Sequence, residues 1–518
     1  MNEPNGRSLL QQAAAARTAL LDEARPEAVE RQRKREAMTA RERIEYLCDR
    51  DTFSEIGGLA HPKASEEANA PADGVVVGTA RIDGRWVVVL SQDFTVFGGS
   101  IGEIGSAKTL RAAKLALSQG LPMIMLLDGG GHRIQGGQNS RHFAKSGTLF
   151  PEFARMSGWV PMVAAMLGAG FAGPTNYAGM ADFVVMVRGL STMGLAGPPL
   201  VKAATGESIT KEELGGCSVQ VDRYGLADLA VASEREALDA VRRFLAFLPS
   251  NARLPAPVTE TDDPAERRAD DLLDIVPANT RKAYDVRKVV QRIADSGSVF
   301  ETKPTFAGNI VTAFARMGGR PVGFIANQPM KLGGMLTSDA CDKAARFIAT
   351  CDAFGLPLIY LIDVPGFAIG SAAEKTVLGR HSAKLVYELG HSTVPRFSVV
   401  LRKGYGLGFI AMCGGRSFEA DASLAWPTAE ICAMSIEGSV DVAYRKDYES
   451  AADPQARRQK IIDDMRANIS VLDAAGGFGI DDVVDPATTR KYLIDAIDRA
   501  PARRDIAMPP KFRSIVPI

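Results

Sequence analysis

The sequence is poor in cysteine and in long apolar runs. Its six cysteines include no Cys-x-x-Cys pair, which argues against a structural zinc site and suits buried thiols in a reducing compartment. The longest apolar stretch, residues 160–173, contains glycines and is shorter than the roughly 20 residues that a membrane-spanning helix needs. Residues 1–7 are polar and do not begin a signal peptide. We therefore predict a cytoplasmic protein that binds neither a metal ion nor a membrane.

The sequence also lacks net charge and the familiar catalytic motifs. Its 61 Lys and Arg residues balance 61 Asp and Glu residues, so no long-range field would attract nucleic acid. The charged run 30–37, ERQRKREA, interleaves acids and bases, which favours a solvated helix face or a subunit contact; we assign it no chemistry. There is no Gly-x-Ser-x-Gly elbow, phosphate-binding loop or His-Glu-x-x-His motif. Function must therefore be sought in other local patterns.

What the sequence does contain is a repeat. Residues 121–137, LPMIMLLDGGGHRIQGG, and residues 356–370, LPLIYLIDVPGFAIG, share a Leu-Pro start, an apolar run and an Asp at the end of that run. The offset between the two Asp residues, 363 minus 128, is 235 residues, and it also relates Gly173 to Gly408. We infer one fold used twice, in which a core strand ends in a glycine-rich turn that presents backbone N–H groups.

The order of the predicted elements indicates an α/β protein. Strands alternate with glycine turns and helices, which favours parallel pairing with helical crossovers. Asp83-Gly84 marks a hairpin, and Thr39 with Glu42 forms a capping box at a helix start. Residues 256–280, rich in proline and charge, are predicted to link a domain over 1–255 to a second domain over 281–518. We predict helices over 8–50, 106–117, 140–156, 284–294, 339–354, 371–389, 454–472 and 487–500, strands over 74–84, 85–92, 121–127, 161–167, 320–327, 358–363 and 396–401, and glycine turns over 168–173 and 404–408.

Two further features of the sequence, His132 and Gly98-Gly99, have more than one interpretation. His132 could act as a general base, but no suitably spaced acid accompanies it, so a contact or packing role is favoured. Gly98-Gly99 either cradles an anion at a helix N-terminus or is part of a simple loop. The paired glycine turns remain as the chemical feature. Their N–H groups would stabilise oxyanions, each donor contributing on the order of 3 kcal/mol in comparable sites, and two turns suit a reaction with two oxyanions.

Ten segments spread over nearly the whole chain carry a resemblance to a known family. They are TARERI at 39–44, GVVVGTARIDG at 74–84, SQDFTVFGGSIGE at 91–103, ELGG at 213–216, LPSN at 248–251, ANQP at 326–329, KAARF at 343–347, DVPGF at 363–367, TVP at 393–395 and AWPTAE at 425–430. With these segments the sequence resembles the carboxyltransferase (beta) subunit of biotin-dependent acyl-CoA carboxylases of the propionyl-CoA carboxylase type.

The resemblance implies a fold, a reaction and partners. The fold would be two tandem crotonase-like (ClpP/crotonase) α/β domains related by duplication, with acyl-CoA on the N-terminal domain and carboxybiotin on the C-terminal domain. The assembly would be a homo-hexamer, a trimer of dimers, with active sites shared between subunits. Biotin would be carried by a separate biotin carboxylase and carrier subunit, because this chain has no Ala-Met-Lys-Met attachment site. The biotin anion would take the α-proton of the acyl-CoA, and the resulting enolate would capture carbon dioxide.

Site residues follow by position. Ala172 and Gly173 match the pair that holds the thioester enolate, and Leu407 and Gly408 match the pair facing the biotin ureido oxygen. The flanking turns contribute Gly130, Gly131, Pro365 and Gly366.

The chain departs from the family pattern at several of these places. Pro174 follows the first pair and has no N–H to donate. Leu407 adds bulk where biotin would approach. Ile410 replaces an acid of the acyl pocket and His132 replaces a small residue, so we place both among the substrate-binding residues and expect a different acyl group.

Three functions remain open on the sequence alone. The first is an acyl-CoA carboxyltransferase subunit, as the resemblance implies. The second is a biotin-independent acyl-CoA decarboxylase of the same fold, favoured by the altered second turn. The third is a non-catalytic paralogue that assembles with active subunits.

Overall fold

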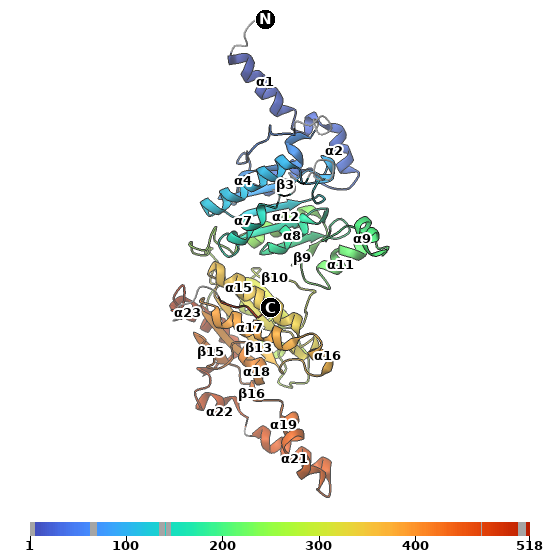
Figure 1. Cartoon of the computed structure of the whole chain (residues 1–518). Coiled ribbons are helices and arrows are strands. Elements are labelled where there is room, and N and C mark those ends of the chain that lie inside the picture. The colour runs from blue at the N-terminus through green and yellow to red at the C-terminus, as the bar shows by residue number, and fades with distance from the viewer. Residues whose placement is uncertain are drawn as a thin grey trace. The chain divides into compact units, whose positions relative to one another are not determined.

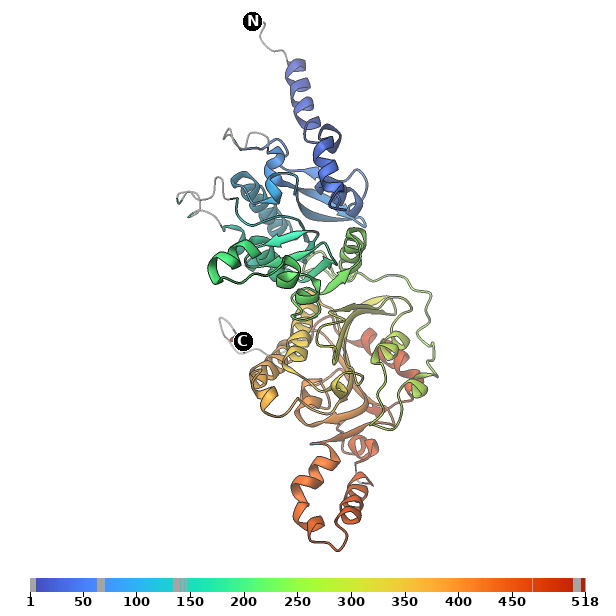
Figure 2. The same ribbon diagram turned by 90° about the vertical axis from the view of Figure 1, so that its right-hand side faces the viewer.

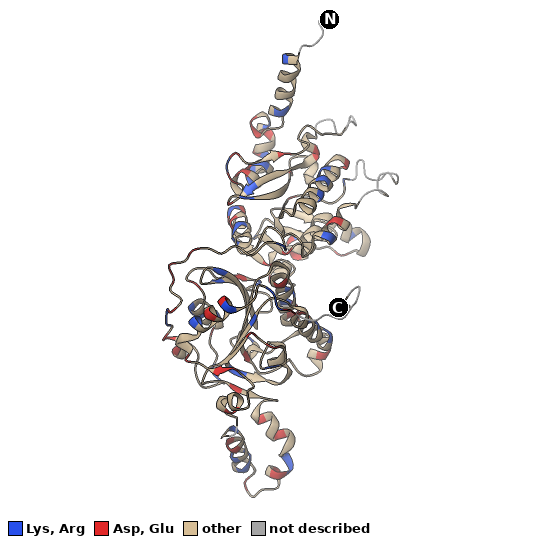
Figure 3. Ribbon diagram, turned by 90° about the vertical axis from the view of Figure 1, so that its left-hand side faces the viewer, with Lys and Arg blue, Asp and Glu red and all other residues tan. Residues whose placement is uncertain are grey.

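The protein consists of two compact units, Met1–Leu254 and Pro255–Ile518, in a computed structural model (Figure 1). The structure describes residues 6–62, 70–133, 140, 144, 147–467, 469–505 and 514–517. Charges of both signs are interspersed along both units (Figure 3). None of the helices in the described ranges is long and apolar enough to cross a membrane.

The first unit is built on a mixed sheet whose described strands follow the order β1-β2-β3-β4-β5-β7-β9. The strands β1 to β3 pair antiparallel and the rest pair parallel, while β6 and β8 form a separate parallel pair. The strand bounds are β1 Ser54–Glu55, β2 Val75–Ile82, β3 Arg85–Gln92, β4 Met123–Leu127, β5 Met162–Met166, β6 Ala169–Phe171, β7 Phe183–Val187, β8 Thr192–Gly194 and β9 Leu229–Val231.

Helices cover both faces of this sheet. Because every residue of β4 and β5 is buried, these strands read as continuous apolar runs rather than as alternating ones. One set of their side chains packs against α4 and α7, and α3 and α12 also contact the sheet. The helix bounds are α1 Gly6–Thr18, α2 Pro26–Arg33, α3 Ala40–Leu47, α4 Glu103–Gln119, α7 Leu149–Met156, α8 Gly173–Met180, α9 Pro198–Thr205, α10 Lys211–Gly215, α11 Cys217–Gln220 and α12 Glu234–Leu245.

The second unit has the same plan. Its described strands follow the order β10-β11-β12-β13-β14-β15-β17, and β16 also pairs with β14. Pairing is antiparallel from β10 to β12 and parallel beyond. The strand bounds are β10 Phe300–Thr302, β11 Ile310–Met317, β12 Arg320–Asn327, β13 Leu358–Val364, β14 Arg396–Tyr405, β15 Ala422–Ala425, β16 Glu430–Cys432 and β17 Asp482–Val483.

A helical arm extends from this second sheet (Figure 2). Its helices α19 and α21 enclose a small apolar cluster of their own, in which Ile436 and Val440 meet Ile461 and Ile462. The helix bounds of the unit are α13 Leu272–Ile275, α14 Val286–Ile293, α15 Ser338–Phe354, α16 Ser371–Glu374, α17 Leu378–His391, α18 Gly406–Ala411, α19 Ile436–Ala443, α20 Arg445–Glu449, α21 Pro454–Ala467, α22 Val471–Gly476 and α23 Thr489–Arg499.

The duplication predicted from the sequence is visible in the elements. The pairs β2 and β11, β3 and β12, and α4 and α15 each have equal length and keep the same 235-residue offset at both ends. The offset slips between β4 and β5. Met123 of β4 pairs with Met162 of β5, whereas Leu358 of β13, at the same offset, pairs with Arg396 of β14, one residue earlier than the offset requires. The helix that follows also begins earlier, at Gly406 in α18 against Gly173 in α8. The two turns are thus similar but not superimposable residue by residue.

Some predicted elements differ from the observed ones. Residues 168–173, predicted as a turn, contain β6, because the backbone there pairs with β8. Residues 404–408 are not a free turn, since β14 continues to Tyr405 and α18 follows at once. The helix predicted over 140–156 is observed as α7 from Leu149, and residues 134–139, 141–143 and 145–146 lie outside the described residues. Part of 256–280, predicted as a linker, contributes Ala269, Leu272 and Val276 to the second core.

Candidate active site

The first turn consists of two glycine-rich segments that meet, residues 129–131 after β4 and residues 168–173 after β5. A Cβ atom added to Gly131 would lie 2.8 Å from the Cβ of Ala172, so there is no room for a side chain between the two segments. The N–H of Gly130 donates to the carbonyl of Gly98 at 3.2 Å. The structure therefore brings together Gly131 and Ala172, two of the predicted site residues.

Ala172 adopts a backbone conformation that residues other than glycine rarely take. It is the N-cap of α8, with φ 64° and ψ −120°. Its N–H donates to the carbonyl of Gly194 at 2.8 Å, and the Thr175 hydroxyl donates to Gly170 O at 2.6 Å. Gly173 begins the helix, and no described residue accepts a hydrogen bond from its N–H. Since the first N–H groups of a helix have no partner within it, Gly173 offers the open donor of this turn.

The second glycine turn has an equivalent arrangement at the carboxyl end of β13. A Cβ atom added to Gly408 would lie 2.9 Å from the Cα of Gly366, so these two predicted site residues are also in contact. The N–H groups of Leu407 and Gly408 have no acceptor among the described residues. The side chain of Leu407 is 55% exposed. The second unit thus presents two adjacent open donors beside an exposed apolar side chain.

A tyrosine lies beside each turn. The Tyr177 hydroxyl would be 3.8 Å from a Cβ on Gly173, and burial raises its pKa to about 12. The Tyr405 hydroxyl donates to a Glu430 carboxylate oxygen at 2.6 Å, and burial, followed by that hydrogen bond, raises the pKa of Tyr405. Both phenols therefore keep their protons at neutral pH and can donate hydrogen bonds, but neither is a base.

The remaining predicted site residues lie around these turns. His132 follows Gly131 and pairs its backbone with Ile101. Pro365 precedes Gly366 and is half-buried, as is Ile410 in α18. A Cβ at Gly130 or Gly366 would meet no atom within 4 Å, which leaves open space next to each turn. Among the residues described, no group of His, Cys, Asp and Glu could hold a metal ion.

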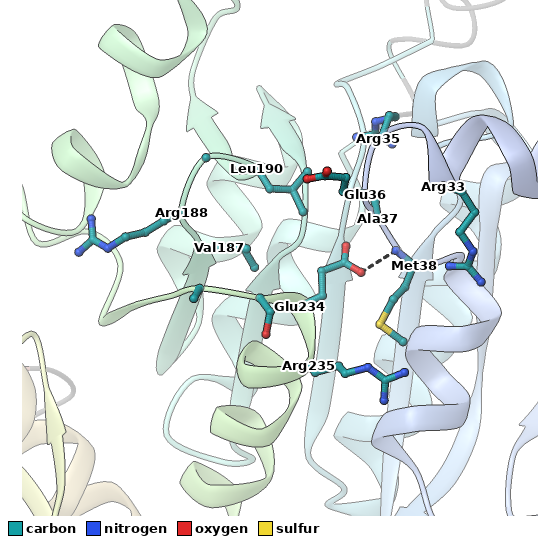
Figure 4. A pocket seen from close by; sticks show the side chains of 13 residues that line it. Arg33, Arg35, Glu36, Ala37, Met38, Val187, Arg188, Leu190, Glu234 and Arg235 are labelled. Atoms are coloured by element: carbon teal, nitrogen blue, oxygen red, sulfur yellow. Dashed lines mark hydrogen bonds between the residues drawn. The ribbon is translucent and has the colours of Figure 1, made fainter.

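A pocket of about 550 Å³ opens near the first turn, at the carboxyl ends of β7 and β9 (Figure 4). Met38 and Glu234 lie on its walls, and the Met38 N–H donates to the Glu234 carboxylate at 2.8 Å. Arg35 lines it and pairs with Asp128 at 3.0 Å. Its lining residues are Arg33, Arg35, Glu36, Ala37, Met38, Val187, Arg188, Gly189, Leu190, Ala232, Ser233, Glu234 and Arg235. Pockets at the carboxyl ends of parallel strands are common ligand sites in α/β folds.

The sequence-based prediction missed the charged residues beneath the turns. Arg35, in the run to which no chemistry was assigned, turns inward to Asp128. Arg43 and Arg402 are fully buried and pair with Asp128 and Asp363. The sequence signal that could have found them is the Asp at the end of each repeated strand, because a buried carboxylate requires a cationic partner.

Similar proteins place this fold in a known class. The chain matches a solved structure described as the transcarboxylase 12S hexamer core with methylmalonyl-coenzyme A bound, at 37% identity and a TM-score of 0.94, covering 100% of this chain and 99% of that one. The propionyl-CoA carboxylase carboxyltransferase subunit of Haloferax mediterranei is 40% identical over 93% of each chain. The methylmalonyl-CoA decarboxylase alpha subunit of Propionigenium modestum is 37% identical over 95% of each.

The likeness to transcarboxylase 12S confirms the predicted fold class, two tandem crotonase-like carboxyltransferase units. The family model described as "Carboxyl transferase domain" matches residues 31–515, and the chain belongs to this carboxyl transferase family.

Proposed function

We propose that this chain is the carboxyltransferase subunit of a biotin-dependent acyl-CoA carboxylase. It would move a carboxyl group from carboxybiotin, held by a partner subunit, to the α-carbon of an acyl-CoA. The observation that carries this proposal is the pair of glycine turns, one in each unit, with N–H groups that no described residue uses. Such fixed donors stabilise an oxygen on which negative charge develops, and this reaction develops charge on two oxygens.

Each turn has its own part in the proposed reaction. The Gly173 N–H would donate to the thioester oxygen as the α-carbon loses its proton. The N–H groups of Leu407 and Gly408 would donate to the ureido oxygen of biotin, whose ring, when bound, supplies the carboxyl group and the base. The open space beside Gly366 would leave room for the biotin ring next to these donors.

The arginine-lined pocket suits the phosphate groups of coenzyme A. Arg235 is exposed, stacks on the Tyr46 ring at 4.8 Å and has no carboxylate partner among the described residues. Arg188 is instead paired with Asp222 at 3.0 Å and points away from Glu234 and Met38 (Figure 4). We expect Arg235→Ala to raise the KM for acyl-CoA about tenfold with kcat unchanged, the loss of one charge-assisted contact. Arg188→Ala is the matched control and should leave KM unchanged.

The relatives support a proposal for the assembly and the substrate. The transcarboxylase 12S structure is described as a hexamer with methylmalonyl-coenzyme A bound, and we propose a homo-hexamer here, with sites shared between the first unit of one subunit and the second unit of another. A short carboxyacyl-CoA product fits the same comparison. Ile410, half-buried in the second turn, would contact the acyl group. The cytoplasmic location predicted from the sequence remains a prediction.

The proposal is tested by reconstitution. The purified chain is mixed with a biotin carboxylase and a biotinylated carrier, ATP, bicarbonate and a panel of acyl-CoAs from acetyl to long-chain. Formation of a carboxyacyl-CoA that depends on every component supports the proposal. If no acyl-CoA is carboxylated by any carrier while the chain binds coenzyme A, the carboxyltransferase assignment is wrong and a non-catalytic role is favoured.

A decarboxylase is the second candidate, because the methylmalonyl-CoA decarboxylase alpha subunit is almost as similar to this chain as the carboxylase subunit is. The bulk of Leu407 at the second turn also favours it. Release of carbon dioxide from methylmalonyl-CoA by the chain alone, with no carrier, would support this candidate over the first.

A further inference from the structure

Each unit buries one carboxylate at the same place in its repeat. Asp128 follows β4 and Asp363 lies near the end of β13, immediately before the two glycine turns, and neither side chain is exposed. Burying a carboxylate is costly unless charges and hydrogen bonds compensate it. The two carboxylates must therefore be held by partners, and those partners show what they connect.

In the first unit, Asp128 connects the turn to the strand that leads to Ala172. Its carboxylate accepts from Arg43 Nη2 at 2.9 Å, and the same nitrogen donates to Leu167 O, just after β5, at 3.2 Å. A Cβ at Gly168 would lie 1.9 Å from Asp128 Oδ1, so the carboxylate packs directly on that backbone. The strand carrying residues 129–131 is thus fastened to the segment carrying Ala172 and Gly173.

In the second unit, Asp363 makes the equivalent connection to β14. Its carboxylate accepts from Arg402 Nε at 2.9 Å, from the Lys403 N–H at 3.2 Å and from Lys403 Nζ at 3.2 Å. Arg402 and Lys403 lie on β14, a few residues before Leu407 and Gly408 of α18. These contacts hold the end of β13, which leads to Gly366, against β14, which leads to the second pair of donors.

The backbone of each aspartate is fixed in the same way in both units. The Asp128 N–H donates to the side-chain oxygen of Gln92 at 3.0 Å, and the Asp363 N–H donates to that of Asn327 at 3.2 Å. The carbonyl on the other side is also closely packed. A Cβ at Gly99 would lie 2.3 Å from Asp128 O, and one at Gly334 would lie 2.7 Å from Asp363 O. Gly99, predicted to lie either in an anion cradle or in a simple loop, packs closely on the backbone of Asp128.

The cations come from different parts of the chain. Arg43 belongs to α3, before the first sheet, whereas Arg402 belongs to β14 in the second sheet. The buried aspartate therefore recurs although its cationic partner does not recur at the repeat offset. Shared ancestry alone would repeat both members, so the aspartate's position under the turn is the feature that both units keep.

We infer that Asp128 and Asp363 are positioning residues, each of which holds the glycine turn of its unit in the geometry that aims its N–H donors. Asp128 acts on the Gly131 and Gly173 side, and Asp363 acts on the Gly366 and Gly408 side. Neither carboxylate reaches a substrate, because both are fully buried. This inference rests on the proposed function, since it assigns Asp128 to the acyl-CoA side and Asp363 to the biotin side.

The test separates the two sides. Asp128→Asn and Asp363→Asn keep side-chain size and remove the charge. Two measurements are made on the full-length chain. The first compares the Kd for a nitro analogue of propionyl-CoA, which mimics the enolate, with the Kd for coenzyme A. The second is the kcat for decomposition of carboxybiotin on its carrier in the absence of acyl-CoA. Asp128→Asn should weaken the nitro analogue at least tenfold with coenzyme A unchanged, and Asp363→Asn should lower the second kcat about 100-fold, as expected for misplaced groups.

Controls distinguish positioning from loss of folded protein. Asp295→Asn breaks another buried pair, with Arg490 at 2.7 Å, away from both turns, and should change neither measurement per folded molecule. If an Asn variant does not fold, Gln92→Leu removes the acceptor of the Asp128 N–H. Asn327→Leu removes the acceptor of the Asp363 N–H together with a donor to Gly334 O. Both should produce the same selective pattern more weakly. The inference would be overturned if the four variants affected both measurements equally. It would also be overturned if the wild type were active and none of the variants changed either measurement. An inactive wild type would instead contradict the proposed function.

Discussion

At the scale of single residues, the first turn depends on an alanine in a strained conformation. Ala172 has φ 64° and ψ −120°, a region that costs a residue with a Cβ about 1–3 kcal/mol. Gly173, next to it, supplies the open donor, so Ala172 contributes shape rather than a hydrogen bond to a ligand. Its own N–H is occupied by Gly194.

Replacing this alanine by glycine should therefore stabilise the protein. We expect Ala172→Gly to raise the thermal midpoint of the first unit by about 2 °C, because glycine adopts positive φ without strain. Ala178 in α8 is the matched control, since Ala178→Gly places glycine within a helix and should lower the midpoint. Differential scanning calorimetry measures both. A fall in the midpoint for Ala172→Gly would show that the turn carries no such strain.

A buried lysine predicts a pH effect on stability. Lys108 Nζ donates to the carbonyls of Ala72 at 2.9 Å and Val75 at 2.7 Å, and burial lowers its pKa from 10.5 to about 8. The folded state thus releases this proton at lower pH than the unfolded chain, so the burial penalty disappears between about pH 8 and 10.5. A neutral amine still has two N–H groups for the two carbonyls.

We expect the wild type to gain stability relative to Lys108→Met as the pH rises through this range. Thermal midpoints of both proteins, measured from pH 7 to pH 10.5, test the prediction. The contributions of all other titrating groups cancel in the difference between the two midpoints. A gap that stays constant or moves in favour of the variant would show that the pKa of Lys108 is not lowered.

The sequence predicted these residues unequally. Gly173 and Gly408 could be identified because the repeat relates them and places them after apolar runs, where close backbone approach needs glycine. Gly131 and Gly366 were assigned through the family resemblance. Arg35 could not be identified, since a run of mixed charge looks the same whether its side chains face solvent or turn inward. Its partner, Asp128, is distant along the chain, and only the folded contacts reveal the pairing.

At the scale of elements, short helices depend on their caps. The capping box predicted at Thr39 is confirmed, with the Glu42 N–H donating to Thr39 Oγ1 at 3.1 Å and the Thr39 N–H donating to Glu42 at 2.8 Å. The helix that it starts, α3, carries Arg43 to Asp128. A local cap therefore supports a contact beneath the first turn.

Removal of this cap should loosen α3. Thr39→Ala is expected to cost about 1–2 kcal/mol, as for other N-caps, and to speed amide hydrogen exchange in α3 about five- to thirtyfold. Thr210 caps the exposed helix α10 with the same box, so Thr210→Ala should affect α10 alone. Unchanged exchange in α3 of Thr39→Ala would show that tertiary packing, not the cap, holds the helix.

The sequence was most informative where an element has its own pattern. The strand over 320–327 is observed at the predicted bounds, and the helix predicted over 339–354 begins one residue earlier. The short strand β6 was missed because Ala169–Phe171 has no strand pattern of its own and is extended only by pairing with β8. Local signals determined the long elements, and distant pairing determined the short ones.

At the scale of the whole molecule, one fold occurs twice in the chain, and we propose that each copy stabilises one oxyanion. The duplication could be inferred from the constant offset, whereas the slip between β4 and β5 could not, because it moves a strand register and a helix start while Gly173 and Gly408 keep the offset. We propose that a complete site takes one turn from each of two subunits. This arrangement is common in symmetric oligomers, where each interface contains the same contacts twice.

Complementation between two inactive variants tests this proposal most directly. Gly173→Val disables the first turn and Gly408→Val the second, where any Cβ would already meet Gly366. Mixed oligomers, selected through two different tags, pair an intact first unit of one chain with an intact second unit of the other. If sites are shared, each pair formed by the two variants should regain about half the wild-type carboxyltransferase activity, while each pair of wild type with the double variant should be inactive. Activity in the second mixture and none in the first would contradict the account.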